Sequence, residues 1–302
     1  MRGGDGMERM YLKMKDKQKI FLQYYIKQER NTTLLYVHGG PGQGCWDFKY
    51  SADMLSQSYN VILYDQRGCL RSDAVTDHFS SELLLEDIEE IRQHFNMDQL
   101  ILCGHSYGGH LILRYALKHP NHVKGLIYVC PTFDFESSMK NVYRIGYQLM
   151  DSSAYCDQLA AIKEGVKDDT PTSYRKHLVD IPEEIRAKIY FSAPVSQQVK
   201  DAIFDSSITD EDWKKGIEQQ NRIFDEEEIY KNYMPFLKQI TIPSLLIVGE
   251  YDPICCEIQQ KAFMDAPNHS MAVIKNAGHS LYVDHADDFV HEINQFMKQM
   301  LV

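Results

Sequence analysis

The chain has 302 residues, of which 44% are hydrophobic and 25% are charged, a composition typical of a globular protein with one sizeable core. Its 32 lysines and arginines stand against 43 aspartates and glutamates, so the formal net charge is −11 at pH 7. This acidity argues against nucleic acids and anionic membrane surfaces as partners.

The N-terminal region gives the first predicted elements and an expected location. The first six residues are polar and rich in glycine, and we expect translation to begin at Met7. The chain has no signal-peptide pattern and no apolar run of membrane-spanning length, so the expected location is the cytoplasm. Its seven cysteines, with no C-x-x-C pair, fit a reducing compartment. Two strand-like runs between Met10 and Lys27 predict a hairpin.

Short apolar runs then alternate with helical patterns. The expected strands lie at residues 34–37, 61–64, 100–103 and 126–129, and the expected helices near 46–58, 81–95 and 107–118. Apolar strands separated by amphipathic helices indicate a parallel sheet covered by helices on both faces. The sequence therefore predicts the α/β class, with a mostly parallel central sheet.

The alternation stops after Pro131. No buried strand pattern occurs between residues 134 and 237, which we expect to form several helices. Two more strands are expected at residues 244–248 and 271–274, followed by a helix from Ala286 to Met300. We therefore predict an α/β core with a helical cap inserted into it. The core would comprise residues 1–133 and 238–302, and the cap residues 134–237.

The turn after the strand at residues 100–103 carries the strongest chemical signal. Residues 104–109 read G-H-S-Y-G-G and directly precede a helical pattern. G-x-S-x-G between a strand and a helix is the nucleophile elbow, in which flanking glycines allow a tight turn and the serine hydroxyl stands above the sheet. The hydroxyl then lies at the positive end of a helix. We therefore predict Ser106 as a nucleophile.

A serine hydroxyl reacts only when a base takes its proton and a carboxylate orients that base. Asp252 and His279 each follow a predicted strand, so both fall at the C-terminal edge of the sheet, where open parallel sheets bind ligands. We predict Ser106, His279 and Asp252 as nucleophile, base and orienting acid. Asp134 is the reserve candidate for the acid.

Residues 38–42, H-G-G-P-G, follow the strand that ends at Val37. Acyl transfer needs backbone N–H groups aimed at the oxygen on which negative charge develops. We predict that the N–H groups of Gly40 and Tyr107 form this oxyanion hole, Tyr107 because the residue after the nucleophile usually contributes.

These motifs resemble those of the α/β-hydrolases and, within them, of the prolyl aminopeptidase (proline iminopeptidase) group. H-G-G-P-G at residues 38–42 and G-H-S-Y-G-G at residues 104–109 match that group. D-Q-R-G-C-L-R-S at residues 65–72 matches its D-Q-R-G-x-G-x-S except at Leu70, where the group has glycine. The resemblance covers residues 34–133 and 243–282. It implies the release of N-terminal proline or another small residue from short peptides.

The resemblance also implies cap glutamates that bind the free α-amino group of the substrate. Residues 134–237 contain one tryptophan, Trp213, and lack the tryptophan–glutamate pairing of the group. The acidic cluster that begins at Asp225 offers Glu226, Glu227 and Glu228 as candidate amine ligands. The same cluster equally fits a helix N-terminus, where acidic side chains are favoured.

The D-Q-R run at residues 65–67 is expected to brace the floor of the site, with Asp65 holding Arg67 or a backbone turn. No metal-ligand spacing and no dinucleotide-binding loop occur, so we predict no metal and no cofactor. The expected partner is a small molecule or short peptide; the sequence defines no oligomeric state.

Two other functions remain open at this point. An esterase, amidase or lactonase acting on a small metabolite would use the same triad, because specificity lies in the cap. A ligand-binding relative without activity is disfavoured by the complete triad. Ser106 also argues against dehalogenase and epoxide-hydrolase chemistry, which needs an aspartate at this position.

Overall fold

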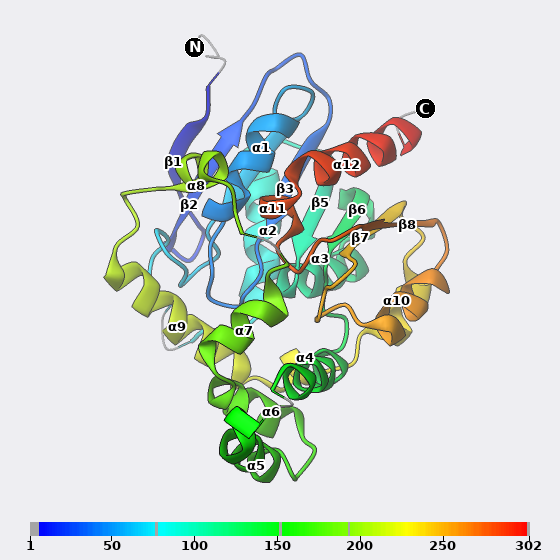
Figure 1. Cartoon of the computed structure of the whole chain (residues 1–302). Coiled ribbons are helices and arrows are strands. Elements are labelled where there is room, and N and C mark those ends of the chain that lie inside the picture. The colour runs from blue at the N-terminus through cyan, green and yellow to red at the C-terminus, as the bar shows by residue number, and fades with distance from the viewer. Residues whose placement is uncertain (1–5, 76–77, 151–152, 193, 301–302) are drawn as a thin grey trace.

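The computed structural model describes residues 6–75, 78–150, 153–192 and 194–300. An eight-stranded sheet runs through the centre of the protein (Figure 1). The strands lie in the order β1 (Glu8–Lys13), β2 (Lys19–Tyr25), β4 (Asn60–Tyr64), β3 (Thr33–Val37), β5 (Leu100–His105), β6 (Val123–Val129), β7 (Ser244–Gly249) and β8 (His269–Ile274). β2 pairs antiparallel with β1 and β4, and all other neighbours are parallel. The predicted hairpin and the mostly parallel sheet are confirmed.

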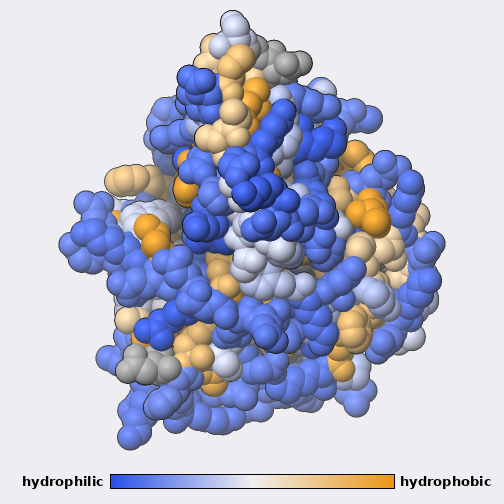
Figure 2. Space-filling model, turned by 90° about the horizontal axis from the view of Figure 1, so that it is seen from below, coloured by the Kyte–Doolittle hydropathy of each residue, from blue (hydrophilic) through white to orange (hydrophobic). Residues whose placement is uncertain are grey.

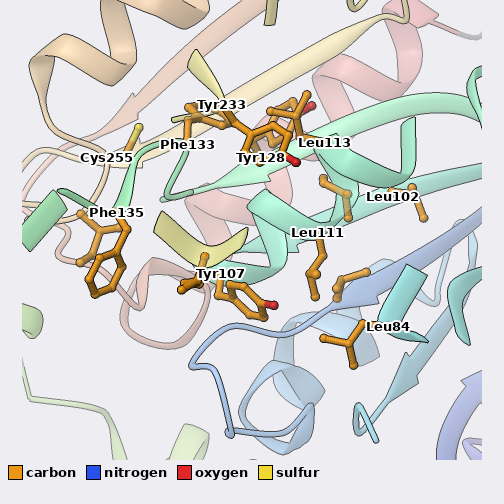
Figure 3. Packing of buried hydrophobic residues seen from close by; sticks show 14 of the residues in the cluster. Leu84, Leu102, Tyr107, Leu111, Leu113, Tyr128, Phe133, Phe135, Tyr233 and Cys255 are labelled. Atoms are coloured by element: carbon orange, nitrogen blue, oxygen red, sulfur yellow. The ribbon is translucent and has the colours of Figure 1, made fainter. Parts of the chain in front are cut away.

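Helices cover both faces of the sheet because successive strand residues point to opposite sides. Leu34 and Tyr36 of β3 belong to one buried cluster, and Leu35 and Val37 to the other. The first cluster packs under α1 (Lys49–Leu55), α11 (Leu281–Asp284) and α12 (Ala286–Met300). The second packs under α2 (Glu82–His94), α3 (Tyr107–Lys118) and α10 (Glu257–Met264). Figure 3 shows part of this second cluster, from Leu84 of α2 across Leu111 of α3.

The chain between β6 and β7 forms helices, and its described residues contain no strand. The helices are α4 (Phe135–Leu149), α5 (Cys156–Gly165), α6 (Pro171–His177), α7 (Glu183–Tyr190), α8 (Gln197–Ile203) and α9 (Asp210–Phe224). The short 3₁₀ helices of the chain are η1 (Trp46–Phe48), η2 (Pro120–His122), η3 (Ser153–Tyr155), η4 (Leu178–Asp180), η5 (Glu227–Tyr230) and η6 (Met234–Gln239). In Figure 1, α4 to α7 gather below the sheet, with α5 and α6 farthest from it. That residues 134–237 act as a separate cap stays a prediction.

The surface of this helical region is largely polar. Viewed from below, Figure 2 shows hydrophilic residues over most of the face, with hydrophobic residues scattered among them. None of the helices in the described parts of the chain combines the length and apolar character needed to cross a bilayer.

The D-Q-R run of residues 65–67, which follows β4, forms contacts with several other segments of the chain. Asp65 binds Arg71 (Oδ2 to Nε, 2.7 Å) and accepts a hydrogen bond from the backbone N–H of Cys45 (2.9 Å). Arg67 instead pairs with the buried Asp87 of α2 (Nε to Oδ2, 2.8 Å). Of the two predicted partners of Asp65, the structure shows the backbone and not Arg67, because Arg67 is engaged by Asp87. The bracing role of the run stays a prediction.

Leu70 stands where the prolyl aminopeptidase group has glycine, and its backbone explains that preference. Its φ is +36°, in the region that favours glycine, and its side chain is fully buried against Gly44. A positive φ costs a non-glycine residue about 1–2 kcal/mol. Removing a buried leucine side chain costs about 3–5 kcal/mol. We expect Leu70→Gly to lower the free energy of unfolding by about 2 kcal/mol, because the lost packing exceeds the relieved strain.

The matched control for this prediction is Leu70→Ala, which removes nearly the same atoms but keeps a Cβ at positive φ. It should be less stable than Leu70→Gly by about 1 kcal/mol in urea unfolding. If the alanine variant is the more stable of the two, backbone strain at Leu70 is absent and the explanation fails.

Candidate active site

Ser106 lies in the sharp turn between β5 and α3, with φ 54° and ψ −118°. A Cβ added at Gly104 would lie 2.5 Å from the carbonyl oxygen of Gly108. One added at Gly108 would lie 2.0 Å from the carbonyl oxygen of Val37 in β3. Contacts this short do not occur between real atoms, so both positions require glycine. The close approach of strand and helix predicted from the G-x-S-x-G motif is confirmed.

His279 and Asp252 meet at the C-terminal edge of the sheet. The Nδ1 atom of His279 lies 2.7 Å from Oδ1 of Asp252, whose side chain is fully buried. The other oxygen of Asp252 accepts the backbone N–H of Cys255 (2.9 Å). Because a carboxylate only accepts hydrogen bonds, Nδ1 carries the proton and Nε2 is left as an acceptor. Asp134, the reserve acid, instead caps α4 and accepts the N–H of Ser137 (3.1 Å).

The backbone of His279 is held from two sides, by the end of α7 and by His105 of β5. Its N–H donates to the carbonyl of Tyr190 at the end of α7 (3.0 Å). Its carbonyl oxygen lies 3.1 Å from Nε2 of His105. The hydroxyl of Tyr282 lies 3.4 Å from the other ring nitrogen of His105 and donates a hydrogen bond to Oδ2 of Asp47 (2.8 Å). Burial lowers the pKa of His105 well below its ordinary value, so this histidine is neutral.

The H-G-G-P-G loop is hydrogen-bonded to the run at residues 65–67. The backbone N–H of Gln66 donates to Nε2 of His38 (3.0 Å), and its side-chain amide donates to the His38 carbonyl (2.8 Å). Burial lowers the pKa of His38 to about 4, which keeps Nε2 available as an acceptor. Gly40 follows with φ +120°. Tyr107 begins α3, whose first N–H groups have no partners within the helix.

A cavity of about 650 Å³ connects these groups. The predicted nucleophile, base and oxyanion residues all line it: Ser106, His279, Gly40 and Tyr107. The remaining lining is largely apolar and comes from both the core and the helices between β6 and β7. It includes Trp46, Phe135, Met139, Phe191, Phe224 and Ile254. The structure thus brings four predicted residues to one cavity, with Asp252 behind His279.

The three glutamates predicted to bind an amine do not line this cavity. Glu226 accepts the backbone N–H of Ser81 at the start of α2 (2.9 Å). Glu228 accepts from the hydroxyl of Tyr233 and lies 3.7 Å from Nε of Arg114. Glu227 is exposed. The structure therefore does not bring these side chains together with Ser106.

Three charged residues that the sequence did not single out line the cavity instead: Asp47, Arg175 and Arg186. Asp47 comes shortly after the H-G-G-P-G loop. This short distance along the sequence is the one feature that could have indicated a place in the site. The arginines lie on short helices, α6 and α7, whose charge pattern is that of any solvent-facing helix. The packing of these helices against the rest of the protein, and not a sequence motif, directs the two arginine side chains to the cavity.

Cys130 adds a third potential ligand beside the acid–base pair. Its Sγ, a carboxylate oxygen of Asp252 and a ring nitrogen of His279 all lie within 4.8 Å of one another. Burial, followed by the charge of Asp252, raises the pKa of the Cys130 thiol well above its ordinary value. A protonated thiol is a poor metal ligand, and the carboxylate is already engaged by His279. The group therefore fits an acid–base pair better than a metal site.

The pH dependence of stability should reveal the buried carboxyl of Asp47. Burial raises its pKa from 3.8 to about 6, although the Tyr282 hydroxyl opposes this. Between these values the native state holds a proton that the unfolded state has lost, so stability falls as pH rises. Asp47→Asn removes this effect. We expect the stability of the variant relative to the natural protein to increase by up to about 3 kcal/mol between pH 4 and pH 7.

Urea unfolding of both proteins at several pH values measures this difference. The free energy of unfolding of the variant is compared with that of the natural protein at each pH. This comparison is needed because burial also raises the pKa of Asp87 to about 6, and the contribution of Asp87 is the same in both proteins. A difference that stays constant with pH would show that Asp47 is ionised with an ordinary pKa.

Comparisons with known proteins agree with this architecture. A sequence model of the α/β-hydrolase fold matches residues 32–161, which include β3 to β6 and the Ser106 turn. The chain has the α/β-hydrolase fold. It is 28% identical to the proline iminopeptidase of Saccharolobus solfataricus over 296 residues, covering 93% of this chain and 89% of the relative. It is 22% identical to that of Heyndrickxia coagulans, covering 93% and 96%.

A solved structure shows the same fold over nearly the whole chain. The crystal structure of a proline iminopeptidase-related protein from Thermus thermophilus superimposes with a TM-score of 0.74 at 16% identity. The match covers 98% of each chain. Among proteins with this fold, the chain therefore resembles the prolyl aminopeptidase group, as its motifs predict.

Proposed function

We propose that this α/β-hydrolase is a serine hydrolase in which Ser106 is the nucleophile, His279 the general base and Asp252 its orienting acid. One observation carries this proposal. Nδ1 of His279 is bound to Asp252 at 2.7 Å, while His279 lines the same cavity as the strained Ser106 turn. This arrangement leaves Nε2 of His279 free to accept the serine proton.

The reaction would proceed through an acyl-enzyme. Ser106 Oγ attacks the substrate carbonyl carbon while His279 takes its proton, and the N–H groups of Gly40 and Tyr107 stabilise the oxyanion. Collapse of the tetrahedral intermediate breaks the bond to the leaving group, which receives the proton from His279. Water, deprotonated by His279, then hydrolyses the ester on Ser106 and restores the free enzyme.

The substrate that we propose is a short peptide from which the enzyme releases N-terminal proline or another small residue. The proline iminopeptidase relatives support this choice. A cavity of about 650 Å³ under helices also suits a small substrate. A free α-amino group would bind at Asp47, because this is the one carboxylate among the described residues that line the cavity.

A second candidate is an esterase, amidase or lactonase acting on a small metabolite. The absence of the candidate glutamates from the lining favours it. The largely apolar lining also favours it, since it suits an uncharged acyl group. The catalytic steps would be identical, and only the leaving group would differ.

Matched chromogenic substrates separate these candidates. The set contains proline and alanine anilides with free and blocked amines, together with short and medium acyl esters, each also tested on Ser106→Ala. Turnover of free-amine anilides that is lost on blocking supports the aminopeptidase. Ester turnover without anilide cleavage rejects it in favour of the second candidate. No turnover in either series, with Ser106 unreactive toward a phosphonate, would reject the serine hydrolase.

A further inference from the structure

Two cap-region arginines that line the cavity lack an acidic partner. Arg175 lies on α6 and Arg186 on α7. The Nε atom of Arg186 is buried and has no hydrogen-bond partner among the described residues. Neither guanidinium has a carboxylate within 4.0 Å in that part of the chain. The cavity wall therefore carries two guanidinium groups that have no ion-pair partner among the described residues.

The buried arginines of the described residues are paired with acids, whereas Arg175 and Arg186 are half-buried and have no such partner. Arg71 binds Asp65 at 2.7 Å, and Arg67 binds Asp87 at 2.8 Å. Removing a guanidinium from water without a partner is costly, so buried cations are normally paired. The chain also has an excess of acidic residues, so partners are abundant. Unpaired arginines on the cavity wall therefore point to an anion supplied by the ligand.

Arg186 is close to the reacting groups through its own helix. It lies one turn before Tyr190, about 6 Å along the helix axis. The carbonyl of Tyr190 accepts the backbone N–H of His279 at 3.0 Å, and the rings of these two residues lie 5.8 Å apart. Arg186 thus extends from a helix that directly contacts the proposed base.

Arg175 is positioned by α9. Its guanidinium carbon stacks over the ring of Phe224 at 4.5 Å, and its Nη2 donates to the side chain of Asn221 at 3.2 Å. Gln220, which precedes Asn221 on α9, donates a hydrogen bond from its side-chain amide to the carbonyl of Pro41 in the H-G-G-P-G loop (3.0 Å). These contacts hold the planar group in place and leave further N–H donors for a ligand.

We propose that Arg175 and Arg186 bind a carboxylate of the substrate, which for a short peptide is its free C-terminal carboxylate. This deepens the proposed function and rests on it for the identity of the substrate. Arginine suits the task because its fixed fork of donors matches the two carboxylate oxygens. A peptide bound with its carbonyl at Ser106 and its C-terminus at these arginines must be short. The arginines would therefore select di- and tripeptides and disfavour longer or C-terminally blocked chains.

Binding to the Ser106→Ala protein tests this proposal without turnover. Titration calorimetry compares Pro-Ala with its C-terminal amide, which differs only in the charge of that end. We expect the amide to bind about 10- to 100-fold more weakly, because it loses charged hydrogen bonds. Arg186→Met on the same background keeps the apolar stem and should abolish most of this difference. Arg186→Lys should restore part of it, since it keeps the charge without the fork.

The matched control is Arg144→Met. Arg144 is an exposed arginine on α4 that does not line the cavity, so its loss should leave the preference unchanged. Equal affinity for the two peptides, no binding of either, or a preference that survives Arg186→Met with the fold intact by circular dichroism would overturn the proposal.

Turnover by the unsubstituted enzyme separates the failure of this proposal from that of the proposed function. Cleavage of Pro-Ala and its amide at equal kcat/KM would support the aminopeptidase and overturn the arginine site. Selective binding of the free acid by Ser106→Ala, with neither peptide cleaved by the active enzyme, would support the arginine site and reject the aminopeptidase.

Discussion

Ser106→Ala is expected to lower kcat by about 10⁴- to 10⁶-fold on every substrate that the enzyme turns over. The variant loses the oxygen that would form the acyl-enzyme, whereas the oxyanion N–H groups and the cavity remain. Alanine keeps the Cβ of serine at φ 54°, so the backbone strain of the turn is unchanged. The free energy of unfolding should therefore shift by less than about 0.5 kcal/mol. Steady-state kinetics and urea unfolding of the same preparation measure both quantities.

The residual activity is the decisive quantity in this comparison. A variant that keeps more than about a tenth of the natural kcat would show that Ser106 is not the nucleophile. A large loss of stability would instead assign the serine a structural role in the turn.

Asp252→Asn is expected to lower kcat by about 10⁴-fold. The buried Asp252 fixes the proton of His279 on Nδ1 and stabilises the positive charge that the ring gains during attack. An asparagine whose oxygen keeps the hydrogen bond from the backbone N–H of Cys255 presents its amide NH2 to Nδ1 of His279, which favours the wrong tautomer. The fall should appear in kcat with little change in KM, because the acid does not line the cavity.

Asp134→Asn is the matched control, because both aspartates were candidates for the same role. Asp134 caps α4, and asparagine caps helices about as well, so kcat should stay within about three-fold and stability within about 0.5 kcal/mol. If Asp134→Asn reduced kcat by more than Asp252→Asn, the assignment of the acid would be reversed.

The fold was predictable because its elements carry strong local signals. β3 to β6 are short apolar runs buried on both faces, and the intervening helices have clear amphipathic spacing. The last helix begins and ends at the residues expected, Ala286 and Met300. Asp252 and His279 could be found for the same reason, since a loop after a parallel strand must lie at the C-terminal edge of the sheet.

The substrate-binding residues could not be predicted in the same way. Their positions depend on how short helices pack over the sheet, and neither periodicity nor motif spacing encodes that packing. The glutamates after Asp225 looked like an amine site, yet Glu226 accepts a backbone N–H at the start of α2. No motif or spacing in the sequence distinguishes Arg186, yet it lines the cavity. The sequence therefore predicted residues that the structure brings to one cavity, Ser106 and His279 among them, but not the side chains that surround a substrate there.

Covalent labelling tests whether Ser106 is an activated nucleophile. The protein is incubated with a fluorophosphonate, and the modified peptide is located by mass spectrometry. We expect one label on Ser106, no label on the Ser106→Ala protein and much slower labelling of Asp252→Asn. A label on another residue, or no label on a folded protein, would contradict it.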